Sequence, residues 1–190
     1  GIVCGGESKG GKHAYMLLEE CVPPVPDITK DEALARLARN YFRSHTPATL
    51  QDFVWWSGLS VTEAKQGIYL IGCELTEEQW KGQTWYLHES GRTRGSIKGH
   101  IQFLPPYDEL LLGYKDRTDV LPSEHYSKAF TGNGLFFPVI LYEGQIVGNW
   151  DRKVKRNGCA PEYSLFRQES RIDEALLDKA QQQYMQFLGK

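Results

Sequence analysis

Three consecutive helix N-termini are the feature that most limits what this chain can fold into. Thr29–Glu32 and Ser60–Glu63 are capping boxes, in which a hydroxyl and a carboxylate each accept a hydrogen bond from a free backbone amide. Thr49 begins a short helix between them, and Ser57-Gly58 ends it. The order predicts one longer helix and then two short helices around a tight turn, which is the helix-turn-helix arrangement.

Apolar spacing indicates that the first two helices are buried. In the first helix the apolar residues are spaced so that a helix of 3.6 residues per turn puts them on one face: Leu34, Leu37, Ala38, Tyr41 and Phe42. The second segment, Leu50–Trp56, is too apolar for an exposed element. We therefore expect both helices to contribute to one core, with Trp55 inside it.

The third helix separates an inward face from an outward one. The residues expected to face inward are Val61, Ala64, Ile68 and Ile71. Thr62, Gln66 and Tyr69 then face outward, with Lys65 on the flank, on the helix that enters the major groove in a helix-turn-helix. Thr62, Lys65 and Gln66 are candidate DNA-binding residues. Lys65 is the only cation on this helix, and the helix lacks the Arg or Asn that reads bases through two hydrogen bonds.

A basic wing is expected beyond the helices. Gln83–Glu89 alternates like a strand, Gly91–Gly99 is a glycine-rich loop without acids, and His100–Leu104 is another short strand. Helices followed by such a hairpin form a winged helix. The loop would present Arg92, Arg94 and Lys98 to DNA phosphates. The alternative is an α+β domain whose three helices serve for packing only.

The two ends of the chain differ from this central segment. A hairpin around the glycine-rich Gly5–Lys12 is expected first, followed by a proline-rich linker at Val22–Pro26. Beyond residue 100, strands dominate and an amphipathic helix, Ser170–Leu188, ends the chain. We predict an α+β fold with a hairpin and linker over 1–28, a winged helix over 29–100, and a β-rich C-terminal domain with a terminal helix over 101–190.

The predicted C-terminal domain carries a second basic segment. Strands are expected at Leu135–Tyr142, Gln145–Lys155 and Tyr163–Phe166. Glu143-Gly144 is a weaker and Asn157-Gly158 a strong hairpin signal between them. The core of the last helix is expected to contain Ile172, Leu176, Tyr184 and Phe187. The second strand presents Arg152, Lys153, Lys155 and Arg156 as candidates for phosphate contact. Both basic segments have the alternative interpretation of ordinary solvated hairpin tips.

Composition and spacing exclude several other classes of protein. The formal net charge of −2 excludes a globally basic nucleic-acid binder but leaves room for a local basic face. Four scattered cysteines indicate reduced thiols and a cytoplasmic protein. The histidines and cysteines are not spaced as metal ligands, and no apolar run is long enough to span a membrane. No cofactor is therefore expected.

One segment resembles a nucleotide-binding loop. Gly6–His13 fits G-x-x-x-x-G-K, but His13 stands where a Ser or Thr hydroxyl must coordinate Mg²⁺. The segment that follows is soon interrupted by Pro23-Pro24, so it offers no long helix to the phosphates. We predict a hairpin tip here and no nucleotide cofactor.

Three further segments together resemble one known family. They are Phe103–Arg117, which includes Tyr107, Asp108, Asp116 and Arg117, then Ala48–Leu59 and Pro138–Trp150. Their sequences, order and spacing are similar to those of the bacterial winged-helix DNA glycosylases, the AlkZ/YcaQ-like family. The resemblance implies tandem winged helices, double-stranded DNA as partner, and hydrolysis of the N-glycosidic bond of alkylated or crosslinked purines. We expect Asp116 and Arg117 to form a structural salt bridge or cap.

The family's catalytic signature, a Gln-apolar-Gln or Gln-apolar-Asp motif, does not occur in this sequence. Gln181-Gln182-Gln183 has the wrong middle residue. The resemblance therefore places the catalytic segment before Gly1, assigns no catalytic residue here, and leaves open whether the chain belongs to an active enzyme. The other hypotheses are a non-catalytic DNA-binding module, such as a transcriptional regulator, and an interaction protein that kept the fold and lost DNA.

Overall fold

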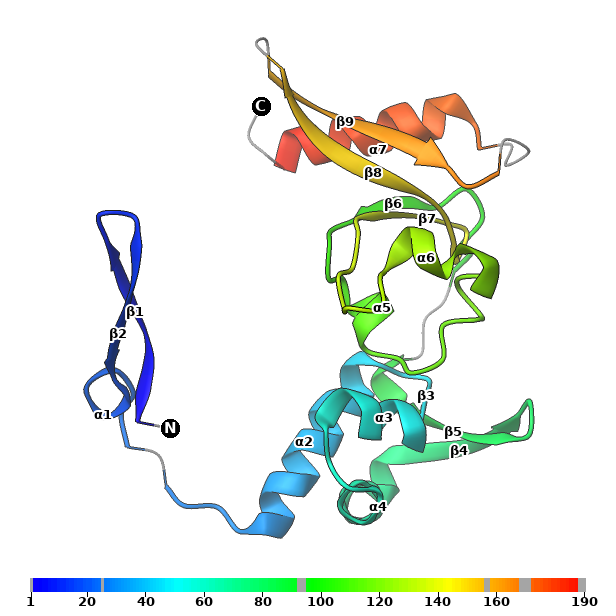
Figure 1. Ribbon diagram of the computed structural model, residues 1–190. Coiled ribbons are helices and arrows are strands. Elements are labelled where there is room, and N and C mark those ends of the chain that lie inside the picture. The colour runs from blue at the N-terminus through cyan, green and yellow to red at the C-terminus, as the bar shows by residue number, and fades with distance from the viewer. Residues whose placement is uncertain (1, 25, 92–94, 156–157, 168–171, 188–190) are drawn as a thin grey trace. The chain divides into compact units, whose positions relative to one another are not determined.

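Figure 1 shows the computed structural model of the chain, which describes residues 2–24, 26–91, 95–155, 158–167 and 172–187. Helices and strands are both abundant, and the strands in these ranges form three antiparallel sheets. The chain divides into two compact units, Gly1–Ala33 and Leu34–Lys190.

The first unit is a β-hairpin. Strands β1 (Val3–Lys9) and β2 (Lys12–Leu17) pair antiparallel, and the short helix α1 (Leu18–Cys21) follows. Gly10 and Gly11 form the turn with φ angles of 59° and 76°, which glycine adopts without strain. The predicted hairpin is confirmed, but its strands include most of the glycine-rich segment. Lys12 begins a strand, so the G-x-x-x-x-G-K match does not lead into a helix.

The three predicted helices are present, and each begins at its predicted capping residue. They are α2 (Lys30–Ser44), α3 (Leu50–Ser57) and α4 (Val61–Leu70). The Glu32 amide donates to Thr29 Oγ1 over 3.2 Å, and Thr49 and Ser60 each form a complete capping box. Gly58 ends α3 in the left-handed region, at φ 70°.

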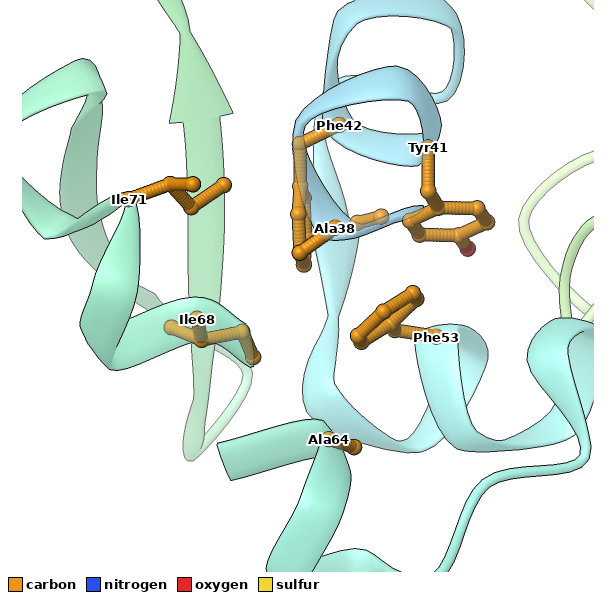
Figure 2. Packing of buried hydrophobic residues seen from close by; sticks show 8 residues of the cluster. Ala38, Tyr41, Phe42, Phe53, Ala64, Ile68 and Ile71 are labelled. Carbon is orange, nitrogen blue, oxygen red and sulfur yellow. The ribbon is translucent and has the colours of Figure 1, made fainter. Parts of the chain in front are cut away.

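An aromatic core joins these helices (Figure 2). The Phe53 ring lies 5.1 Å from Tyr41 and 5.4 Å from Phe42, all three fully buried, while Ala64, Ile68 and Ile71 close the core from the α4 side. The prediction for Trp55 was wrong, because its side chain is 53% exposed. Two residues correspond to about 200° around a helix, so burying Phe53 turns Trp55 to the opposite side. Val61, the first residue of α4, is also exposed, against expectation.

The second sheet covers this helical core. It contains β3 (Ala48–Thr49), β4 (Leu75–Trp80) and β5 (Gln83–His88) in the order β3-β5-β4, flanked by the 3₁₀ turns η1 (Gly72–Glu74) and η2 (Glu89–Gly91). Lys81-Gly82 forms the turn of the β4–β5 hairpin. Strand β4 was missed because Thr76–Gln79 is polar and lacks the apolar alternation of a half-buried strand.

The predicted position of the wing was therefore wrong. Strand β6 (Ile101–Leu104) pairs with β7 (Val139–Tyr142), so the loop Gly91–Gly99 connects two sheets instead of closing a hairpin. Strand pairing depends on partners distant in sequence, and a basic loop between two apolar runs does not reveal it. Lys98 is exposed on this loop, while Arg92 and Arg94 lie outside the described residues.

The third sheet has the order β6-β7-β8-β9, with β8 (Gln145–Lys155) and β9 (Gly158–Leu165) forming a long hairpin. Short helical segments connect β6 to β7: α5 (Glu109–Leu112), η3 (Ser123–His125) and α6 (Tyr126–Ala129). The last helix, α7 (Glu174–Phe187), packs against β6 and β9 (Figure 1). Compared with prediction, β7 is shorter and β9 longer.

This sheet is covered on both faces. Ile140 and Tyr142 of β7 pack with Leu177 and Ala180 of α7, whereas Val139 and Leu141 pack with Leu111 and Ala129 from the connecting helices. That explains the continuous apolar run of β7, since both of its faces are buried.

The predicted core of α7 is partly correct. Ile172 is buried, and Leu176 and Tyr184 are partly buried against the same cluster, but Phe187, the last residue of the helix, is 85% exposed. Among the described residues no helix has the length and apolar content that crossing a membrane requires.

Candidate nucleic-acid interface

The outer face of α4 lies as predicted. Thr62, Lys65 and Gln66 are exposed, and the Ser60 capping box fixes the start of the helix. Gly67 on the inner face allows close approach to α2, because a Cβ there would lie 3.1 Å from the Leu34 carbonyl oxygen. The candidate recognition residues are therefore held on a helix that packs closely on the core.

The β4–β5 hairpin follows α4 and is not basic. Glu77 and Glu78 of β4 are exposed. The tip cation, Lys81, lies 4.2 Å from the centre of the Trp80 ring and forms an ion pair with Asp119. The charge of Lys81 is thus already matched by a carboxylate of the same chain. Sequence spacing gave no signal for this pairing, because the two residues are distant in sequence.

The β8–β9 hairpin carries the second predicted basic segment. Arg152 and Lys153 are exposed, and Lys153 Nζ lies 3.1 Å from Glu162 Oε2 on the opposite strand. Lys155 is the last residue of β8. Arg156 and the side chain of Lys155 lie outside the described residues. A role for these residues in DNA contact stays a prediction.

The two aspartates of the family-like segment organise local backbone. Asp108 caps α5 and accepts a hydrogen bond of 2.9 Å from the Leu110 amide. Asp116 accepts hydrogen bonds from the Thr118 amide at 2.9 Å and from its hydroxyl at 2.7 Å. These bonds, the amide foremost, hold the pKa of Asp116 below its usual value. Both carboxylates have structural partners.

Arg117 has a different environment from the one predicted. The residue is only 8% exposed, its Nε donates to the Leu111 carbonyl, and its Nη1 donates to the Lys115 carbonyl over 3.2 Å. Burial lowers the pKa of the guanidinium. No carboxylate of the described residues forms an ion pair with Arg117. Of the two alternatives expected for Asp116 and Arg117, the salt bridge is therefore wrong, whereas Asp116 does cap a backbone amide, that of Thr118.

Aromatic rings surround the Arg117 guanidinium. The centres of the Phe130, Trp55 and Phe136 rings lie 5.3, 5.6 and 5.7 Å from its central carbon. Trp55 is held further by its Nε1, which donates to the Leu112 carbonyl over 3.1 Å. Sequence reasoning assigned Trp55 to the core and missed this arrangement.

The described residues contain no group of three or more His, Cys, Asp and Glu side chains that could hold a metal ion. His45, the residue after α2, is buried, stacks on Tyr41 with 4.6 Å between the ring centres, and has its Nε2 3.3 Å from Glu109 Oε2 at the start of α5. The candidate interface thus consists of the exposed outer face of α4 and the exposed basic residues of β8, both carried by packed elements of the second unit.

Comparison with known proteins assigns the chain to a family. A model of the AlkZ-like DNA glycosylase family matches residues 2–187. The chain belongs to this family. An AlkZ-like relative from Streptomyces sahachiroi, an interstrand DNA cross-link repair glycosylase, is 27% identical over 164 residues, covering 80% of this chain and 43% of the relative.

The fold agrees with that of a solved AlkZ-like protein. The Streptomyces sahachiroi DNA glycosylase AlkZ superposes with a TM-score of 0.75 at 23% sequence identity, over 94% of this chain and 49% of that one. The chain thus spans less than half the length of these AlkZ-like relatives.

Proposed function

We propose that this chain is the DNA-binding scaffold part of a DNA glycosylase-like repair protein that acts on alkylated or crosslinked purines. The observation that carries the proposal is the family match over residues 2–187, which includes every described helix and strand. The relative named as a cross-link repair glycosylase supports the same reaction class.

The central segment, residues 29–100, acts in this proposal as a winged helix. Its support is the element order α2-β3-α3-α4-β4-β5, in which the short β3 between the first two helices pairs with β5. The β4–β5 hairpin takes the place of the wing. The boundaries at residues 28 and 100 remain our prediction, as does a cytoplasmic location.

Double-stranded DNA is the proposed partner, bound chiefly through its phosphates. The proposed contact residues are Thr62, Lys65 and Gln66 on α4, then Arg92, Arg94 and Lys98, which lie between β5 and β6 in the sequence, and Arg152, Lys153, Lys155 and Arg156. Phosphate contacts release counterions and give affinity that depends on salt and little on sequence. This binding needs no cofactor.

A transcriptional regulator is the second candidate, and the exposed outer face of α4 favours it. Two observations weigh against it. Lys65 is the only cation on that helix, and the hairpin beside it presents Glu77 and Glu78. A surface of this charge is poorly suited to insertion into a groove lined by phosphates.

Salt dependence of binding tests the proposed DNA surface. We expect a smaller slope of log affinity against log salt concentration when Arg92, Arg94, Arg152 and Arg156 are replaced by Ala. The slope should decrease in magnitude by about 0.9 for each phosphate that the variant no longer neutralises. A matched control replaces four other cations, Lys12, Lys81, Lys128 and Lys179. Equal slopes for the two quadruple variants would refute this assignment.

Base excision is expected to need more than these 190 residues. Cleaving the glycosidic bond requires a positioned water and a group that stabilises positive charge at the sugar. An abasic-site assay on DNA containing 7-methylguanine checks this. Excision by the chain alone, abolished by Asp108→Asn or Asp116→Asn, would place the active site within it.

A further inference from the structure

Trp55, Arg117, Phe136 and Tyr107 form a continuous row of side chains from three separate segments of the second unit. The Arg117 guanidinium lies 5.6 Å from the Trp55 ring and 5.7 Å from the Phe136 ring. The Phe136 ring lies 6.0 Å from the Tyr107 ring. Each step is within the range of cation–π or aromatic contact.

Both ends of the row are open to solvent. Trp55 is 53% exposed and Tyr107 is 50% exposed, and Leu135 and Phe137 add exposed apolar surface beside Phe136. The indole cannot turn freely, because its Nε1 is bonded to the Leu112 carbonyl and one face lies against Arg117. Exposed aromatic rings fixed in this way are typical of binding surfaces rather than of solvated ones.

Tyr107 is held at a conformational cost. Its φ is 60°, in the left-handed region that L residues avoid. The other described non-glycine residues with positive φ, Lys81 and Glu143, each precede a glycine in a hairpin turn. Tyr107 instead follows Pro106, at the turn position that glycine normally takes when proline comes first. Strain of this kind is commonly kept where the side chain has a function.

The middle of the row carries a buried cation on which the nearby carboxylates Asp52 and Asp116 act only from beyond ion-pair distance. Arg117 Nη2 is buried without a hydrogen-bond partner, and within the described ranges the guanidinium has no ion-pair partner. Beneath the rings this charge is only weakly screened. The row therefore favours an anion that also offers flat rings to stack on the exposed aromatics, which describes a nucleotide.

We propose that the row formed by Trp55, Arg117, Phe136 and Tyr107 binds unpaired DNA nucleotides. Bases stack on the exposed faces of Trp55 and Tyr107, and the phosphate between them is attracted by Arg117. Paired bases hide their faces inside the helical stack, so only single-stranded, gapped or extruded nucleotides can stack on a protein ring. The inference rests on the proposed function and specifies which DNA structure this surface selects.

Fluorescence anisotropy with three labelled DNAs tests this site: a thymidine oligonucleotide, a fully paired duplex, and the same duplex with a short single-stranded gap. Trp55→Ala and Tyr107→Ala should each weaken binding to single-stranded and gapped DNA about tenfold. Binding to the paired duplex should change less than about twofold, because phosphate contacts elsewhere supply that affinity. Tyr15→Ala is the matched control, since Tyr15 is 76% exposed on the β1–β2 hairpin of the first unit, which the proposal gives no part in DNA binding.

Tyr107→Gly separates a binding role from a structural one. Glycine adopts the left-handed conformation without strain, so this variant should unfold at the same temperature as the wild type or a higher one. It should lose binding to gapped DNA as Tyr107→Ala does. A lowered unfolding temperature together with unchanged binding would show that Tyr107 serves the fold only.

The outcomes distinguish the two proposals. If the wild-type chain binds none of the three DNAs, the proposed function and this site both fail. If it binds paired duplex while the Trp55 and Tyr107 variants bind gapped DNA as Tyr15→Ala does, this site alone is refuted. Sedimentation that shows a wild-type dimer dissociated by Trp55→Ala would assign the surface to a second copy and overturn the proposal.

Discussion

The helical core of α2–α4 and the sheet β6–β9 are stabilised in different ways. The helices share one cluster in which Tyr41, Phe42 and Phe53 are fully buried and in mutual ring contact. The sheet lies between two smaller clusters, and β7 contributes alternate residues to each. Local capping signals define the first region, whereas strand partners distant in sequence define the second. The helical region was therefore predictable in detail, and the sheet was predictable only in outline.

The largest expected effect tests the burial contrast within α3. Phe53→Ala removes a fully buried ring from the centre of the helical core and should destabilise the protein by about 3–5 kcal/mol. Trp55→Ala removes a half-exposed ring, one hydrogen bond and one cation–π contact, and should cost about 1 kcal/mol. Urea unfolding of both variants gives the comparison. Equal losses would show that Trp55 belongs to the core after all.

A core substitution in the sheet sharpens the comparison between the two regions. Ile140 is fully buried between β7 and α7, so Ile140→Ala should cost about 3 kcal/mol. Ile97→Ala is the control, because Ile97 is 63% exposed on the connecting loop. If the whole second unit unfolds as one, the Phe53 and Ile140 variants will each give a single denaturation transition. Two separate transitions in either variant would show that the sheet and the helices unfold independently.

The two capping boxes differ in burial and should differ in energy. Asp52 is buried, and its carboxylate accepts hydrogen bonds from the Thr49 amide at 2.9 Å and from the Lys115 amide at 2.8 Å. Asp52→Ala leaves these donors without a partner and should cost about 2 kcal/mol. Glu63→Ala, in the more exposed box of α4, should cost about 0.5–1 kcal/mol. The free energies of unfolding in urea measure both, and an equal loss would contradict the role of Asp52 in joining α3 to Lys115.

The smallest expected effect depends on pH. Hydrogen bonds from Arg39 to Glu74, at 2.8–3.0 Å, lower the pKa of Glu74 below its ordinary value of 4.5. A carboxylate with a lowered pKa stabilises the folded state fully above its ordinary pKa, and the contribution is lost as the pH falls through the lowered value. Glu74→Gln should therefore lower Tm at pH 7 by about 2 °C or less, and the difference should vanish in acid. Glu78→Gln, on the exposed face of β4, is the control. A difference that persists at low pH would refute the ion-pair explanation.

Sequence determined the elements whose signals are local. Capping boxes placed the starts of α2, α3 and α4 correctly, because the groups that satisfy the first amides lie within four residues of one another. Gly58 marked the end of α3, and the Glu143-Gly144 turn marked the end of β7, because turn residues also act within a few positions of the chain. The outer face of α4 followed from its 3.6-residue period, and the family-like segments identified the family that the comparisons show.

Tertiary structure decided everything that depends on partners far apart in the chain. It paired β6 with β7 and so removed the expected wing, and it matched Lys81 with Asp119. It also turned Trp55 outward and placed Arg117 beneath it, because burying Phe53 leaves the indole on the opposite side of a short helix. Spacing along a sequence specifies which residues share a face, but only packing specifies what that face meets.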